Sequence, residues 1–210
     1  MRHERGYPTL LLPGITGGSP SLIPMERHLL ARGIAAIRVP FPIVLMRGIR
    51  HYGHIVARHV MRMHARYGEP VNVIGWSMGG TNAVSAMRHP DAAAATRRII
   101  AVCSPLDGSW PAHLAAHRLA RLFLKAPREI VPGSALLREL TALTDDPTRA
   151  WEIATVNGPF ALDPLAPGPL KRFRPDLAIL GPYTHLAPLG DAGLLQLLTE
   201  LVKKRSLAAD

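Results

Sequence analysis

One short stretch constrains the fold of this chain more than any other feature. Residues 70–74 form an apolar run that predicts a buried strand, and residues 81–88 favour a helix. Ser77 lies between them, so it is expected on a very tight strand-to-helix turn. A Cβ atom two positions before or after this serine would collide with neighbouring backbone, and Gly75 and Gly79 avoid both collisions. The stretch therefore predicts that Ser77 projects from a sharp turn at the end of a buried strand.

Apolar runs alternate with helical patterns along the rest of the chain. Strands are predicted at residues 9–12, 35–39, 71–74, 99–102, 153–156 and 177–180. Helices are predicted at residues 21–32, 49–67, 78–87 and 191–205. Strands that alternate with helices pair in parallel and are covered on both faces. We therefore expect an α/β fold, with a doubly wound, mostly parallel sheet and helices on both of its faces.

The length and composition are those of one domain. The chain has 210 residues, of which 48% are hydrophobic, and this is enough to build a sizeable core. Residues 104–150 are the least regular segment, because prolines interrupt two or three short helical patterns there. We expect a single domain over residues 1–210, with a short helical cap inserted at about residues 104–150.

The charge of the chain bears on its partners. The formal net charge of +10 comes from arginines spread along most of the sequence. Nucleic-acid binding favours a clustered basic stripe with interleaved aromatic residues, and the sequence has neither, so no nucleic-acid partner is expected. The basic residues are interpreted mainly as solvated helix faces. Peripheral contact with an anionic membrane stays open, because a positive field attracts such a surface at low salt.

The cysteine count and the apolar runs bear on location. Cys103 is the only cysteine, so no intrachain disulfide can form, and its apolar neighbours at residues 99–102 place it on a buried strand. The run at residues 9–12 is too short for the core of a signal peptide, and no run approaches the roughly 20 residues of a membrane span. A cytoplasmic location is expected.

A serine nucleophile needs a histidine base and an acid that orients the histidine. On a turn of this kind the chain order is serine, acid, histidine. His185 is the expected base, because it follows the predicted strand at 177–180 and a turn. Asp163 is the expected acid, since it lies in the loop one strand earlier. Asp107, in the loop after the strand that holds Cys103, is the alternative acid.

Acyl chemistry also needs backbone N–H groups that bind a developing oxyanion. The N–H of Met78, directly after the serine, is the first expected donor. The glycine-rich loop at residues 13–18 follows the first predicted strand, and its glycines let the backbone approach a substrate closely. Ile15 in this loop is the second expected donor.

Four histidines, His51, His54, His59 and His64, lie on one predicted helix. Only His51 and His54 share a helical face well, and no local carboxylate or cysteine completes a zinc set. The glycine-rich loop at residues 13–18 also lacks the spacing of nucleotide-binding loops. Neither a metal nor an organic cofactor is expected.

On these residues the chain resembles the α/β-hydrolase superfamily, and within it the small bacterial serine lipases and esterases, over nearly its whole length. The resemblance is carried by the segments 11–18, 75–80, 161–165 and 184–185, which look like the oxyanion loop, nucleophile turn, acid loop and histidine loop. It implies a carboxylic ester hydrolase that acts on a small-molecule or lipid ester through an acyl-enzyme. Ser77 would be the nucleophile, His185 the base and Asp163 its partner.

Two other functions fit the same residues. An acyltransferase would use the same three side chains, but an alcohol or thiol would intercept the acyl-enzyme in a water-poor pocket. A noncatalytic binding protein would keep the fold alone, because a fold does not determine a function. The presence of serine, acid and histidine at fitting places favours an enzyme.

Overall fold

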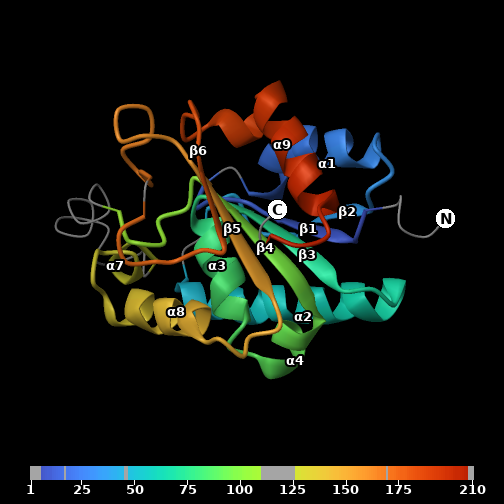
Figure 1. Cartoon of the computed structure of the whole chain (residues 1–210), viewed down its shortest axis with the longest axis horizontal. Helices are drawn as coiled ribbons and strands as arrows, with labels where there is room; N and C mark the ends of the chain where they lie inside the picture. Colours follow the sequence, from blue (N-terminus) through green and yellow to red (C-terminus); the bar gives the residue numbers. More distant parts are fainter. Residues whose placement is uncertain (1–5, 17, 45–46, 110–125, 169, 208–210) are drawn as a thin grey trace.

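A six-stranded sheet runs through the centre of the computed structural model, with the strand order β2-β1-β3-β4-β5-β6 (Figure 1). The strands are β1 (Thr9–Leu12), β2 (Ala36–Arg38), β3 (Val71–Trp76), β4 (Thr96–Val102), β5 (Glu152–Asn157) and β6 (Leu177–Leu180). All five pairings are parallel. The structure describes residues 6–16, 18–44, 47–109, 126–168 and 170–207. The predicted α/β class with a parallel sheet is confirmed.

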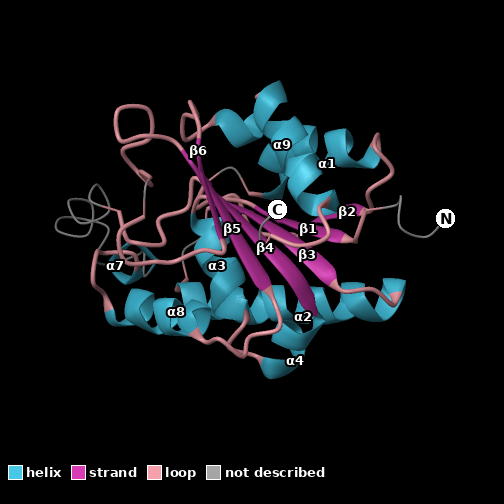
Figure 2. Ribbon diagram, viewed as in Figure 1, coloured by secondary structure: helices cyan, strands magenta, loops and turns pink. Residues whose placement is uncertain are grey.

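Helices cover both faces of this sheet (Figure 2). One face carries α1 (Ile23–Leu30) and α9 (Ala192–Lys203). The other carries α2 (Ile49–Tyr67), α3 (Met78–Ala86), α4 (Pro90–Ala95) and α8 (Ala135–Asp145). Three short elements complete the description: the 3-10 turns η1 (Ser19–Leu22) and η2 (Ala187–Leu189), and α7 (Ala126–Glu129).

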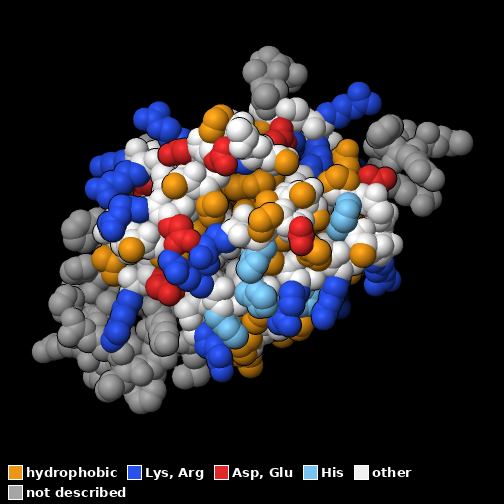
Figure 3. Space-filling view, turned by 90° about the horizontal axis from the view of Figure 1, so that it is seen from below, with side chains coloured by type: hydrophobic (Ala, Val, Ile, Leu, Met, Phe, Trp, Pro, Cys, Tyr) orange, Lys and Arg blue, Asp and Glu red, His pale blue; other side chains and the backbone are white. Residues whose placement is uncertain are grey.

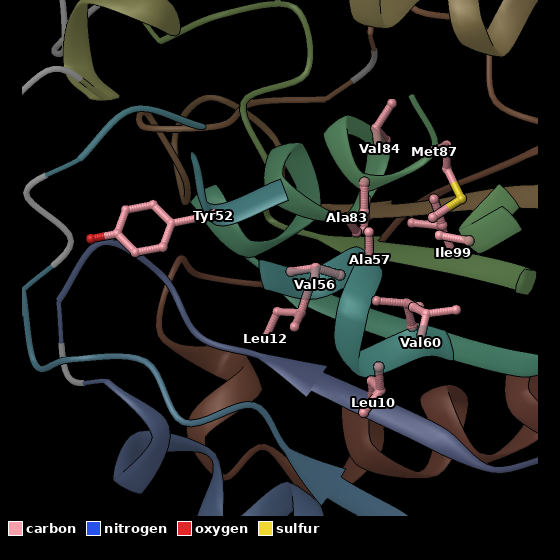
Figure 4. Packing of buried hydrophobic residues seen from close by; sticks show 14 of the residues in the cluster. Leu10, Leu12, Tyr52, Val56, Ala57, Val60, Ala83, Val84, Met87 and Ile99 are labelled. Atoms are coloured by element: carbon pink, nitrogen blue, oxygen red, sulfur yellow. The ribbon is translucent and has the colours of Figure 1, made fainter. Parts of the chain in front are cut away.

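Each face of the sheet has its own hydrophobic core. Leu10 and Leu12 of β1 belong to the same buried cluster as Val56 and Val60 of α2 (Figure 4). Leu11, between the two leucines, belongs to the cluster on the other face. This alternation follows from the two-residue period of a strand. A strand buried on both faces reads as a continuous apolar run, which is why β1 could be recognised in the sequence.

The predicted elements are present, with differences at their ends. The predicted helix at residues 21–32 is divided into η1 and α1. The helix predicted at residues 78–87 is present as α3, which ends one residue earlier, at Ala86, shortly before Pro90. The same proline opens α4, which was not predicted. Proline suits the first turn of a helix, where its missing N–H has no intrahelical partner, so it ends one helix and begins the next.

Part of the predicted cap segment packs on the face of the sheet that carries α2. Leu136 and Leu140 of α8 are buried in the cluster on the α2 face, and α8 contacts α3. Ser134 caps α8 by accepting a hydrogen bond from the N–H of Leu137 at 3.2 Å. Residues 110–125 are outside the described residues. The division into one domain with a cap insertion therefore stays a prediction.

A fully buried arginine joins β4 to β5 and to the end of α9. The Nε and Nη2 groups of Arg98 donate to one carboxylate oxygen of Glu152, at 2.9 and 2.5 Å. Nη1 donates to the carbonyl of Lys204 at 3.0 Å and also to that of Leu201. Burial alone would raise the pKa of Glu152, but hydrogen bonds from the Leu207 N–H and from Arg98 lower it below its ordinary value. Glu152 therefore stays a carboxylate beside Arg98.

Replacing this arginine is expected to weaken the fold strongly. Arg98→Ala leaves Glu152 without its cation and removes one donor from the carbonyls of Leu201 and Lys204. The expected loss in the free energy of unfolding is about 3–5 kcal/mol, measured by chemical denaturation. Arg62→Ala, at an exposed position of α2, is the control and should change stability by less than about 0.5 kcal/mol. Equal losses in the two variants would contradict the structural role of Arg98.

Candidate active site

Ser77 lies on the turn between β3 and α3. Its φ of 53° and ψ of −125° are rare for a residue with a side chain, and such a strained backbone persists only where its surroundings demand it. A Cβ atom on Gly75 would lie 2.5 Å from the backbone of Gly79, and one on Gly79 would lie 2.5 Å from the carbonyl oxygen of Leu12. Both glycines are therefore required for the steric reason inferred from the sequence.

Ser77, His185 and Asp163 form one hydrogen-bonded series. The hydroxyl oxygen of Ser77 lies 2.9 Å from Nε2 of His185. The other ring nitrogen, Nδ1, lies 3.0 and 3.2 Å from the two carboxylate oxygens of Asp163. The three residues follow β3, β6 and β5, whose carboxyl ends meet at one edge of the sheet. This is the arrangement expected from the order of the three residues in the sequence.

The carboxylate of Asp163 is buried and fully engaged. Its side chain is 0% exposed, and Oδ1 accepts hydrogen bonds from the N–H groups of Leu165 and Ala166, both at 3.1 Å. Burial would raise the pKa of Asp163, but hydrogen bonds from His185 and from the N–H of Ala166 outweigh it and lower the pKa. Asp163 is thus held as a carboxylate beside the ring.

Asp107 has a different set of partners. Its Oδ2 accepts from the N–H of Arg172 at 2.9 Å and from that of Lys171, and its Oδ1 accepts from the N–H of Phe173 at 2.7 Å. These three amides belong to one loop, so Asp107 fastens the segment that leads to β6. Of the two acids considered from the sequence, the structure brings Asp163 to the imidazole.

The two expected oxyanion donors belong to segments that lie next to the serine. Met78 is the first residue of α3, where a backbone N–H has no partner inside the helix. The loop that holds Ile15 is close as well, because a Cβ atom on Gly14 would lie 3.1 Å from Cβ of Ser77. Ile15 is half-buried and its neighbour Thr16 is exposed. The positive end of the α3 dipole and the loop after β1 thus border the serine hydroxyl.

Two residues for which the sequence predicted no role at the site contact the histidine loop. The indole Nε1–H of Trp76 donates to the carbonyl of His185 at 2.7 Å. The thiol of Cys103 donates to the carbonyl of Thr184 at 3.6 Å. Cys103 follows β4, is 0% exposed and has a φ of 47°. No local pattern predicts these contacts, which join residues 109 and 81 positions apart.

A mostly apolar hollow of about 470 Å³ lies beside the acid loop. Its lining includes Pro105, Phe160, Ala166 and Leu170, with Lys171 and Arg172 also on its wall. Ser104, which follows Cys103, lines it too, so the hollow is at the same edge of the sheet as the three residues of the hydrogen-bonded series.

The histidines of α2 lie on its outer surface or are partly buried. His51, His54 and His64 are exposed and His59 is half-buried. Within the part of the chain that the structure describes, no group of three or more His, Cys, Asp or Glu side chains lies together as a metal ion would need. Figure 3 shows the molecule from below, with basic and histidine side chains on this face. None of the described helices is long and apolar enough to span a bilayer.

Comparison with known proteins gives matches in structure only. No model of a known protein family matches the chain, and no curated protein matches it in sequence. The mature form of the lipase BlEst2 from Bacillus licheniformis superposes with a TM-score of 0.77 at 18% identity, over 94% of this chain and 92% of that one. Its propeptide form gives 0.81 at 16% identity, over 98% and 52%.

Lipase B from Aspergillus fumigatus superposes with a TM-score of 0.76 at 16% identity, over 95% of this chain and 53% of that one. The chain thus spans about half the length of this fungal lipase and of the BlEst2 propeptide form. Likeness at such identities concerns the fold. The chain has the α/β-hydrolase fold, as the sequence predicted, and its structure is similar to those of bacterial and fungal lipases.

A methyl group at Gly158 is expected to displace the histidine. Gly158 follows β5, and a Cβ atom there would lie 1.8 Å from the carbonyl oxygen of Tyr183, two residues before His185. Gly158→Ala should therefore slow labelling of Ser77 by a fluorophosphonate about 100-fold, since small misplacements of reacting groups have effects of this size. Gly193→Ala, where the nearest atom is 3.4 Å away, is the matched control. A normal labelling rate in folded Gly158→Ala would contradict this packing.

The lowered pKa of Asp163 predicts acid sensitivity. A carboxyl with a lower pKa in the folded state contributes stability above its unfolded pKa of about 3.9, and this contribution is lost as the pH falls through the folded pKa. The free energy of unfolding, measured from pH 7 down to about pH 3, should therefore fall more steeply in the wild type than in Asp163→Asn. Parallel curves for the two proteins would show that Asp163 makes no such contribution.

Proposed function

We propose that this chain is a serine hydrolase that cleaves carboxylic esters, of the esterase or lipase kind. The observation that carries the proposal is the series of hydrogen bonds from Ser77 through His185 to the buried carboxylate of Asp163. A serine hydroxyl is a weak nucleophile near neutral pH, and this series supplies the base and the orienting group that it needs. The lipase names of the structural neighbours support the same class of reaction.

In the first half of the reaction, Nδ1–H of His185 donates to Asp163, which leaves Nε2 free to take the proton of Ser77. The serine oxygen attacks the ester carbonyl carbon, and the carbonyl oxygen becomes an oxyanion. The N–H groups of Met78 and Ile15 are the proposed donors to it. His185 then gives the proton to the departing alcohol, so the products of this half are an acyl-enzyme and the free alcohol.

In the second half, water replaces the alcohol. His185 takes a proton from the water as it attacks the acyl-enzyme, and returns it to the Ser77 oxygen when the acid leaves. The carboxylate of Asp163 stabilises the imidazolium in both halves. The hollow beside the acid loop offers space for an apolar part of the substrate at this edge.

Hydrolysis of p-nitrophenyl esters, from acetate to palmitate, tests the proposal. Ser77→Ala and His185→Ala should each lower kcat about 10⁴-fold or more, and Asp163→Asn by a comparable factor. Asp107→Asn is the matched acid control and should keep most of the activity, because Asp107 contacts a different loop.

Two outcomes would contradict the proposal. A folded protein that turns over no ester, but whose Ser77 reacts with a fluorophosphonate, would favour acyl transfer to another acceptor. A folded protein whose Ser77 does not react would favour noncatalytic binding.

A further inference from the structure

Two side chains from neighbouring strands hold two consecutive carbonyl groups of the histidine loop. Trp76, the last residue of β3, donates from its indole to the carbonyl of His185 itself. Cys103, directly after β4, donates from its thiol to the carbonyl of Thr184. β3 and β4 pair in the centre of the sheet, so both donors lie at the ends of its two central strands.

The loop between β6 and α9 is attached at its start by the N–H of Gly181, which donates to the carbonyl of Asn157 at 3.0 Å, and Tyr183, Ala187 and Leu189 pack against the cluster on the α9 face. Pro182, Thr184 and Leu186 are exposed, and the backbone hydrogen bonds around His185 are short-range turns, such as Ala187 N–H to the carbonyl of Thr184 at 3.1 Å. Turns of this kind shape the loop but do not attach it to the sheet. The position of the imidazole therefore depends on contacts that cross from the loop to the strands.

Both donors are shielded from water. Trp76 is 5% exposed and Cys103 is 0% exposed, so solvent does not compete for either hydrogen bond. The thiol also lies near Asp163, and burial together with the Asp163 charge raises the pKa of Cys103 well above its ordinary value. The sulfur therefore keeps its proton and remains a donor. Cys103 thus lies near the acid and contacts the histidine loop.

Packing in the core explains the burial of these two residues but not the direction of their polar atoms. Trp76 and Cys103 belong to the hydrophobic cluster on the α9 face. A buried indole N–H needs an acceptor, and here the acceptor is the peptide group of the histidine whose ring contacts Ser77. The ring centroids of Trp76 and His185 are 6.0 Å apart, and the tryptophan makes no hydrogen bond to the reacting atoms.

We propose that Trp76 and Cys103 are positioning residues, which fix His185 at hydrogen-bond distance from both Ser77 and Asp163. This inference rests on the proposed ester hydrolysis. Loss of either donor lets the loop shift, and a shift of about 1 Å in a proton-transferring group slows a reaction about 100-fold. The expected signature is a lower kcat with an unchanged KM, because substrate binding does not depend on the position of the base.

Trp76→Phe is the decisive variant, since phenylalanine keeps an aromatic side chain and removes only the N–H donor and one ring. Its kcat on a p-nitrophenyl ester should fall tenfold to 100-fold while KM stays within about twofold. Trp151→Phe is the matched control, because Trp151 is 4% exposed and packs beneath Arg149 before β5. The control should lose stability in thermal unfolding without the change in kcat.

Cys103→Ala is the second variant and covers the case in which Trp76→Phe does not fold. It should lower kcat with an unchanged KM in the same way. Amide hydrogen exchange of residues 183–189 gives a readout that does not require turnover. These amides should exchange faster in both variants than in the wild type and in Trp151→Phe.

The outcomes separate this inference from the proposed function. If the wild type hydrolyses esters and both variants keep its kcat, or if KM rises while kcat is unchanged, the positioning role is overturned and the proposed function stands. If the wild type hydrolyses no ester, the proposed function fails, and hydrogen exchange alone decides whether the two donors hold the loop. Unchanged exchange in both variants would overturn the inference.

Discussion

The close approach of backbone to backbone at the end of β3 is the constraint on which the rest of the site depends. Where Gly79 passes Leu12, and Gly75 passes Gly79, there is no room for a Cβ atom. This packing brings the start of α3 against β1 and holds Ser77 at a φ that residues with side chains rarely adopt. The serine hydroxyl and the first amides of α3 therefore face the same edge of the sheet, as a reaction that develops negative charge requires.

The parallel sheet turns three distant sequence positions into one site. The carboxyl ends of β3, β5 and β6 open at a single edge, so the loops that follow them meet there. Burial of Asp163 makes its interaction with the imidazole strong, because water does not screen it, and its backbone donors offset the cost of burying a charge. Asp163 contributes to the fold and to the proposed chemistry through the same hydrogen bonds.

Contacts over long sequence distances limit what the pattern of residues could predict. The predicted helix at residues 49–67 agrees with α2 at both ends, because its apolar period and Gly68 are local signals. The acceptor at the N-terminus of that helix is not local. The carboxylate of Glu129, 80 positions away along the chain, accepts a hydrogen bond from the N–H of Ile49 at 2.5 Å. The buried ion pair between Arg98 and Glu152 could not be predicted from the sequence either. A buried arginine on a strand and an exposed one have the same local sequence pattern. Such contacts depend on which segments the fold brings together.

The sequence by itself determined the class of fold, the turn that presents the serine, and the short set of residues from which an acid and a base could come. These follow from local rules: the apolar period of strands and helices, the space that glycine leaves, and the order of loops along one sheet edge. Tertiary structure decided that Asp163 rather than Asp107 contacts the imidazole, and that Trp76 and Cys103 hold its loop. The reason is that hydrogen bonds need distances near 3 Å, and the paths of loops between strands, which set those distances, depend on packing across the whole molecule.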